Sequence, residues 1–278
     1  MLLRPSAIKI NLFFRFFKLF PLINMHDGGL QRFAKYMNSK LASTSQQNLS
    51  AALSTVPGDP RYSVIFADTL TLLFEGIART VEIHQPLIET YYGPGRLTTI
   101  LTFLQDECDK QSVKIFNEFR KKRNVKEKMD KVRDSVYGSS SALSTTTSMT
   151  GSFTSNSSSD SKLEARELDH VLEEMALLQA RSEMYFKFVR KKSFVDIDSN
   201  SDSSDVNNDE TKKKIERQLL NCGLCQSVQE LMSEYIFFEE FYMTQNIRYA
   251  IVTQYINFHM FKEKYRYNFV RSTHSCIH

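Results

Sequence analysis

VIFADTLTLLFEGIARTVEIHQPLIETYYGPGRL, residues 64–97, is the stretch of the chain that decides its fold class. Apolar side chains recur through it at steps of three and four, which is typical of an amphipathic α-helix. The apolar face is broad, so we expect two or more neighbouring elements to cover it. The Gly93-Pro94-Gly95 sequence should end the helix, because glycine suits the helix C-terminus and proline cannot continue the helix.

The residues around this stretch predict how the helix begins and where it is interrupted. We expect a helix over residues 61–92, with the Asp59 carboxylate capping it and Pro60 at its first position. Pro86 lies inside the pattern and removes one helical hydrogen bond, so we expect a kink or an end there.

The same periodicity predicts four further helices, and no strand-like alternation competes with it anywhere. They are expected at residues 30–56, 96–136, 162–194 and 211–250. Arg120-Lys121-Lys122-Arg123, in the second of these, is predicted to be a solvated part of the helix rather than a phosphate-binding patch. The sequence thus predicts an all-α chain, with residues 13–137 forming a helical bundle region.

Two segments between the helices are predicted to be disordered. Residues 138–161 are rich in Ser and Thr and cannot bury enough apolar surface to offset the entropy of ordering. Residues 195–210 are acidic and rich in Ser, and we predict a disordered loop there.

Composition excludes some classes of protein. The formal net charge of +4 over 278 residues does not favour a nucleic-acid binder, which would carry a dense basic face. The four cysteines are too few and too unevenly spaced for a secreted disulfide scaffold, so a reducing compartment is expected.

Cys222 and Cys225 form the one motif-like cysteine pair and carry one alternative function, a thiol or zinc protein. Redox chemistry would favour a helix N-terminus beside a βαβ unit, and zinc would need two more ligands. Two cysteines packed on a helix core face are the favoured interpretation.

His84 lacks a neighbouring nucleophile and is interpreted as a partly buried histidine rather than a general base. We predict no catalytic, cofactor-binding or metal-binding residues, no cofactor and no enzymatic activity.

The N-terminal residues carry another alternative, a peripheral membrane-binding protein. Residues 1–23 are rich in Phe and Leu and lack acidic residues. Lys9, Arg15 and Lys18 interrupt the apolar run, which is too short for a membrane span of ~20 residues. A basic aromatic helix at residues 13–22 would suit a membrane surface. A bundle helix with basic residues on its solvated face is the favoured interpretation, because the run is too short for a span.

Several long motifs resemble subunit four of the conserved oligomeric Golgi complex, a vesicle tether. They cover most of the chain and are more specific than helical composition alone. They are FFKLFPL (16–22), LQRF (30–33), FADTLTLLFEGIAR (66–79), EIHQPLIETYYGPGRL (82–97), LQDECDKQ (104–111), ARELDHVLEEMALLQARSEMYF (165–186) and NCGLCQSVQELMSEYIFFEEFYM (221–243). Residues 1–12 and 251–278 do not resemble the family, whose members are much longer.

The resemblance implies an elongated stack of helical bundles, as in multisubunit tethering complexes. It implies a peripheral protein on the cytosolic face of the Golgi membrane, acting in retrograde transport within the Golgi. The implied partners are the sister subunits, SNAREs and a Sec/Munc-class regulator, with no nucleic acid. The family has no catalytic residues to carry over, so the resemblance also implies a non-enzymatic fragment of a larger subunit.

Overall fold

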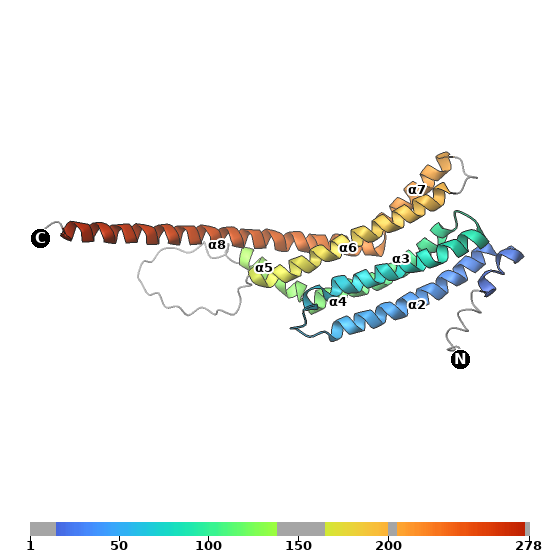
Figure 1. Cartoon of the computed structure of the whole chain (residues 1–278), viewed down its shortest axis with the longest axis horizontal. Coiled ribbons are helices and arrows are strands. Elements are labelled where there is room, and N and C mark those ends of the chain that lie inside the picture. The colour runs from blue at the N-terminus through green and yellow to red at the C-terminus, as the bar shows by residue number, and fades with distance from the viewer. Residues whose placement is uncertain (1–14, 138–164, 200–204, 276–278) are drawn as a thin grey trace. The chain divides into compact units, whose positions relative to one another are not determined.

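The computed structural model describes residues 15–137, 165–199 and 205–275, and within these ranges it is helical with no strand (Figure 1). The predicted all-α class is confirmed there. The predictions for residues 1–12 and 138–161 lie outside the described residues. The elements are η1 (Pro21–Ile23), α2 (His26–Ser54), η2 (Tyr62–Val64), α3 (Ile65–Tyr92), α4 (Leu97–Lys122), α5 (Val125–Tyr137), α6 (Ala165–Asp198), α7 (Asp205–Leu220) and α8 (Gly223–Ser275).

The chain divides into two compact units. Unit 1 comprises Met1–Val125 and Glu173–Ser233, and unit 2 comprises Lys126–Leu172 and Glu234–His278. Helices α6 and α8 therefore contribute residues to both units.

Unit 1 is built on α2, α3 and α4, which pack against one another in all three pairs (Figure 1). The apolar stripes predicted from the sequence supply its core. Buried members include Leu30, Phe33, Met37, Phe66, Leu70, Leu73, Ile77, Val81, Leu97, Leu101, Leu104, Cys108, Ile115 and Phe119. Leu72 belongs to the same apolar pattern of α3, but its side chain is 49% exposed. Helix α6 joins this core where the Tyr185 ring stacks on Phe74, with centroids 4.4 Å apart.

The start of α3 differs from the prediction. The Asp59 carboxylate accepts the backbone N–H of Arg61 at 2.8 Å, but α3 begins only at Ile65, after η2. Asp59 thus orders the preceding turn and does not cap the helix. At the other end, α3 continues through Pro86 to Tyr92, so the helix does not end at the proline.

Two predicted helices are each broken in two. The helix predicted over residues 96–136 divides into α4 and α5 at Asn124, whose φ of 51° lies in the left-handed region that Asn tolerates better than most residues.

 Asn24, with a φ of 58°, ends η1 in the same left-handed region. The helix predicted over residues 211–250 divides into α7 and α8 at residues 221–222.

Both ends of the predicted acidic loop are helical. Helix α6 extends to Asp198 and α7 begins at Asp205. Residues 195–198 and 205–210 of the predicted loop are therefore helical, and residues 200–204 lie outside the described residues. Helix α8 also continues well beyond residue 250, to Ser275.

Unit 2 contains α5 from Lys126 onward, the first part of α6 and the distal part of α8. Its buried apolar residues include Val132, Leu168, Val171, Leu172, Phe238 and Phe241. The Tyr242 hydroxyl donates to the Asp169 carboxylate at 3.4 Å, which links α8 to α6 within this unit. None of the helices, over the described residues, combines the length and apolar character needed to cross a bilayer.

Candidate functional site

Three carboxylates in unit 1 accept backbone N–H groups at the start of a neighbouring helix. The first N–H groups of a helix have no partner within it, and neither α3 nor α4 is capped by its own N-cap side chain. Glu174 of α6 supplies the cap for α3, Asp196 of α6 supplies it for α4, and Asp109 of α4 supplies it for α8.

Glu174 is the most deeply buried of the three. Its Oε1 atom accepts the backbone N–H of Phe66 at 2.9 Å, and its Oε2 atom accepts the Nε–H of Arg123 at 2.7 Å. The Glu174 side chain is 0% exposed and that of Arg123 is 8% exposed. One carboxylate therefore joins the start of α3, the end of α4 and the body of α6.

Arg123 has further contacts that hold its guanidinium in place. It also donates to the carbonyl oxygen of Tyr62, and its guanidinium carbon lies 4.4 Å from the centroid of the Tyr62 ring. This arrangement corrects the prediction that residues 120–123 form a solvated part of the helix. Lys121 does lie exposed and pairs with Glu118 at 2.6 Å, but Arg123 belongs to the core.

Burial raises the pKa of Glu174 above its ordinary value of 4.5, and the Arg123 charge and the backbone N–H groups of α3 oppose this rise. The cost of removing the carboxylate from water thus exceeds the gain from its partners, as is common for buried ion pairs. A raised carboxyl pKa can mark a general acid. Here both oxygens are already occupied by structural donors, so the geometry indicates a structural role.

Asp196 caps α4 through both of its oxygens. Oδ2 accepts the backbone N–H and the hydroxyl of Thr98, each at 2.7 Å, and Oδ1 accepts the N–H of Gly95 at 3.1 Å. Asp196 is buried. Helix α6 therefore carries a cap near each end of its unit 1 portion, one for α3 and one for α4.

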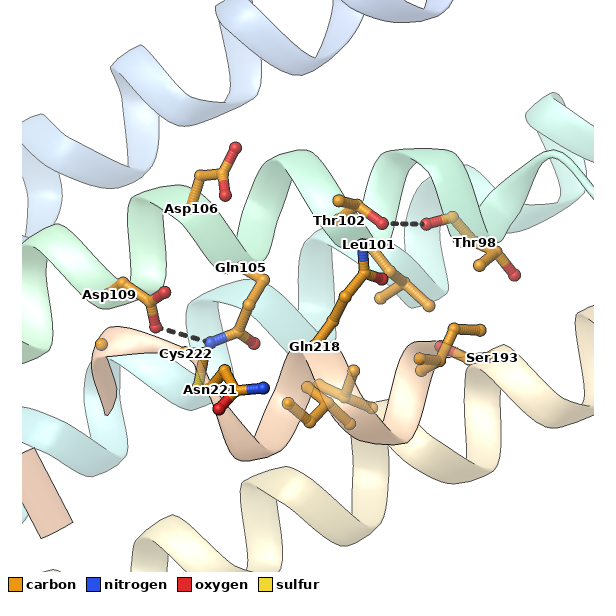
Figure 2. A pocket seen from close by; sticks show the side chains of 14 residues that line it. Thr98, Leu101, Thr102, Gln105, Asp106, Asp109, Ser193, Gln218, Asn221 and Cys222 are labelled. Atoms are coloured by element: carbon orange, nitrogen blue, oxygen red, sulfur yellow. Dashed lines mark hydrogen bonds between the residues drawn. The ribbon is translucent and has the colours of Figure 1, made fainter. Parts of the chain in front are cut away.

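Asp109 lies at one end of a cavity of about 350 Å³ formed by α4, α6, α7 and the α7–α8 turn (Figure 2). Its Oδ1 atom accepts the backbone N–H of Leu224 at 3.0 Å and the side-chain N–H of Gln105 at 2.8 Å. Gln105 in turn accepts the Tyr185 hydroxyl at 2.9 Å. Figure 2 shows the Gln105 amide turned toward Asp109, with Thr98 and Thr102 farther along α4.

The close approach of Asp109 to Gly223 explains why glycine begins α8. A Cβ atom at position 223 would lie 3.2 Å from the Asp109 Cβ and 3.4 Å from its Cγ. The Asp109 side chain would have to shift to make room for this Cβ atom, because real Cβ contacts are rarely this short. The rest of the lining consists of amides, hydroxyls and aliphatic groups, together with the Asp106 carboxylate and the Cys222 thiol.

Cys222 lies in the turn between α7 and α8, and Cys225 lies in the first turn of α8. The sequence had instead predicted both inside one continuous helix. The Sγ atom of Cys222 accepts the backbone N–H of Cys225 at 3.4 Å. Burial raises the pKa of Cys222 to about 12, and the nearby Asp109 charge contributes to the rise. Burial also raises the pKa of Cys225. A helix N-terminus normally stabilises a thiolate, but here the Asp109 carboxylate already occupies that position.

The other sequence candidates also behave as structural residues. The His84 ring meets Phe33 edge-on, with centroids 5.2 Å apart, and burial lowers the pKa of His84. Among the described residues, no group of three or more His, Cys, Asp or Glu side chains is placed to hold a metal ion.

Sequence reasoning missed all three capping carboxylates. One signal was available for Glu174, since it lies three residues after buried Val171 and four before buried Leu178. An acidic residue on the apolar stripe of a helix needs a buried partner. The identity of that partner depends on contacts between residues far apart in the chain.

Comparison with known proteins agrees with the helical architecture. Residues 15–269 match the family model described as COG4 transport protein, middle alpha-helical bundle. The chain belongs to the COG4 transport protein family. This match runs into residues 251–278, where the sequence showed no resemblance to the family.

Curated relatives carry the printed name conserved oligomeric Golgi complex subunit 4. The protein from Bos taurus is 41% identical over 238 residues, and that from Homo sapiens is 40% identical over 238 residues. The protein from Drosophila melanogaster is 30% identical over 246 residues. Each match covers 85% of this chain, but the chain spans only 28% of the Bos taurus and Homo sapiens proteins and 31% of the Drosophila protein. No solved structure gave a significant match.

Proposed function

We propose that this COG4 family chain is a non-enzymatic part of a Golgi vesicle-tethering complex, and that it acts through helix-mediated contacts with sister subunits. The observation that carries the proposal is the family match over residues 15–269. In the proposal the protein is peripheral on the cytosolic face of the Golgi membrane and acts in retrograde transport within the Golgi. Its further partners are SNAREs and a Sec/Munc-class regulator.

The arrangement of buried polar groups supports a scaffold. The carboxylates of Glu174, Asp196 and Asp109 are each engaged by backbone donors of another helix. Groups used in this way fix the mutual position of helices and are not available for proton transfer to a substrate.

An exposed apolar face on the unit 2 part of α8 supports contacts with partner helices. Ile236, Met243, Ile247 and Ile251 follow one another at steps of seven, four and four residues, and all four are exposed. Residues at these spacings share one helix face. We call this set the α8 face. Apolar side chains at such steps are those by which a helix docks against a partner helix.

Co-expression with the sister subunits tests whether the α8 face is used. The tagged chain is captured with and without Met243→Asp and Ile247→Asp, and the sister subunits in the eluate are quantified. We expect the pair of substitutions to reduce recovery at least about tenfold, because a charge in the centre of an apolar interface is left unpaired.

A matched control uses Val56→Asp with Ile83→Asp, two exposed apolar positions in unit 1. These substitutions add the same charge and should leave recovery unchanged. Equal recovery with both pairs would exclude the α8 face as the contact. Failure of the unsubstituted chain to recover any sister subunit would contradict the proposed assembly itself.

A further inference from the structure

The first described residues of unit 1 are fixed to α2 and α3 by one buried aromatic side chain. Phe17 is 2% exposed, and its ring lies 4.6 Å from that of Phe33 and 4.5 Å from that of Tyr92. The Tyr92 hydroxyl donates to the carbonyl oxygen of Phe17 at 2.7 Å. The segment around Phe17 therefore has a defined orientation on the bundle.

Apolar side chains on either side of this anchor point away from the core. Phe16 is 55% exposed, Leu19 49%, Leu22 79% and Ile23 62%. We call these four residues the N-terminal patch. They lie on a short helical segment, a turn and η1, so the described residues 15–22 do not form the continuous interfacial helix that was considered for residues 13–22.

An open apolar cavity of about 570 Å³ lies within the patch. Its lining includes Phe16, Leu19, Phe20 and Ile23, together with Arg32 of α2. Clustered exposed apolar groups of this kind on a protein surface indicate an interaction site, because single exposed residues are normal but grouped ones are not.

Basic side chains outnumber acidic ones in the segment that carries the patch. Residues 15–35 contain four basic side chains, Arg15, Lys18, Arg32 and Lys35, and one acidic side chain, Asp27. The Asp27 carboxylate lies 3.1 Å from the Arg96 guanidinium, which offsets its charge. Arg32 lies over the Phe20 ring at 5.7 Å and Lys18 over the Tyr91 ring at 4.9 Å, so two cations lie against aromatic rings in or near the patch.

We propose that the N-terminal patch binds the surface of an anionic lipid bilayer. Large apolar side chains enter the boundary between head groups and acyl chains, while nearby Lys and Arg attract anionic head groups. The patch combines both features on a turn and a short 3₁₀ helix, without the regular spacing that a partner helix would need. This binding goes beyond the proposed contacts with sister subunits.

Vesicle co-sedimentation of the whole chain tests the proposal. One set of vesicles contains phosphatidylcholine alone, and the other contains phosphatidylcholine with phosphatidylserine. We expect the chain to sediment with the phosphatidylserine vesicles and not with the neutral ones, and to be released as salt is raised. Equal sedimentation with the two sets, or none with either, would overturn the proposal, and in the second case the patch would be assigned to a protein partner.

Substitutions then place the binding on the patch. Leu22→Asp with Ile23→Asp should lower the vesicle partition coefficient at least about tenfold, because two apolar side chains no longer leave water. Val56→Asp with Ile83→Asp is the matched control and should not change it. Far-UV circular dichroism and urea unfolding must agree among the three proteins. Undiminished binding of the folded Leu22→Asp, Ile23→Asp variant would overturn the assignment to the patch, whatever the result of the salt series.

Discussion

The Nε atom of Arg123 lies 2.7 Å from Oε2 of Glu174, and the other oxygen of the same carboxylate accepts the backbone N–H of Phe66. The two side chains come from α4 and α6, and their contacts reach the first residues of α3 and the carbonyl oxygen of Tyr62. A single buried ion pair thus connects three helices of unit 1, and its loss has predictable consequences.

Removing one partner of this pair should be costly. We expect Glu174→Ala to lower the free energy of unfolding by about 3–5 kcal/mol, because Arg123 would remain buried without its carboxylate. The double variant Arg123→Met, Glu174→Leu should lose less than Glu174→Ala alone, since no charge is then buried. Urea unfolding of the two variants measures the difference. A double variant that loses more than the single one would show that the pair is not coupled as the distances indicate.

The Glu174 carboxyl should also give stability a specific pH dependence. Its pKa in the folded chain is raised above the ordinary 4.5 by burial. The folded state therefore binds the proton more tightly than the unfolded state, and this contribution to stability is lost as pH rises from 4.5 through the raised pKa. We expect the slope to be no steeper than about 1.4 kcal/mol per pH unit for one group. Subtracting the unfolding free energy of Glu174→Gln at each pH isolates this slope, and a difference that rises with pH would contradict it.

Asp196 should contribute to stability as the cap of α4. Asp196→Ala removes the acceptor of the Gly95 and Thr98 N–H groups, and we expect a loss of about 2 kcal/mol, at the upper end for a helix cap because the site is buried. Asp198→Ala is the matched control. Asp198 is 56% exposed and pairs with Lys212 on the surface, so its loss should cost about 0–1 kcal/mol. Equal effects of the two substitutions in urea unfolding would exclude a capping role.

The thiols of Cys222 and Cys225 should react slowly in the folded chain. The pKa of Cys222 is raised to about 12 and that of Cys225 is also raised, so little thiolate is present near neutral pH. A disulfide reagent should label Cys222 and Cys225 only after urea is added. The experiment uses a Cys276→Ser background, because residue 276 lies outside the described residues. A fast phase at neutral pH that Cys225→Ser removes would instead support the thiol alternative.

The helices were predictable because their signal is local. The apolar residues of α3 recur at helical steps, and Leu73, Ile77 and Val81 among them are buried. The pattern alone did not show that Leu72 would be exposed, because a broad apolar face does not indicate which of its edges a neighbour covers. The all-α class needed only this periodicity.

The breaks and the caps were not predictable in the same way. Asn124 adopts a positive φ inside a charged run that also suits a continuous helix. Gly223 begins α8 because Asp109, more than a hundred residues earlier, approaches it closely. The cap that Glu174 supplies to Phe66 likewise joins residues 108 apart in sequence. Such pairs depend on the packing of helices, which no local pattern contains.

Affinity purification of the tagged chain from its own cells, with mass spectrometry of the proteins that accompany it, tests the central claim most directly. We predict recovery of the sister subunits of the conserved oligomeric Golgi complex above their level with an unrelated tagged control. Absence of these subunits, with the tagged chain soluble and abundant in the eluate, would contradict the claim that this chain works as part of the tethering complex.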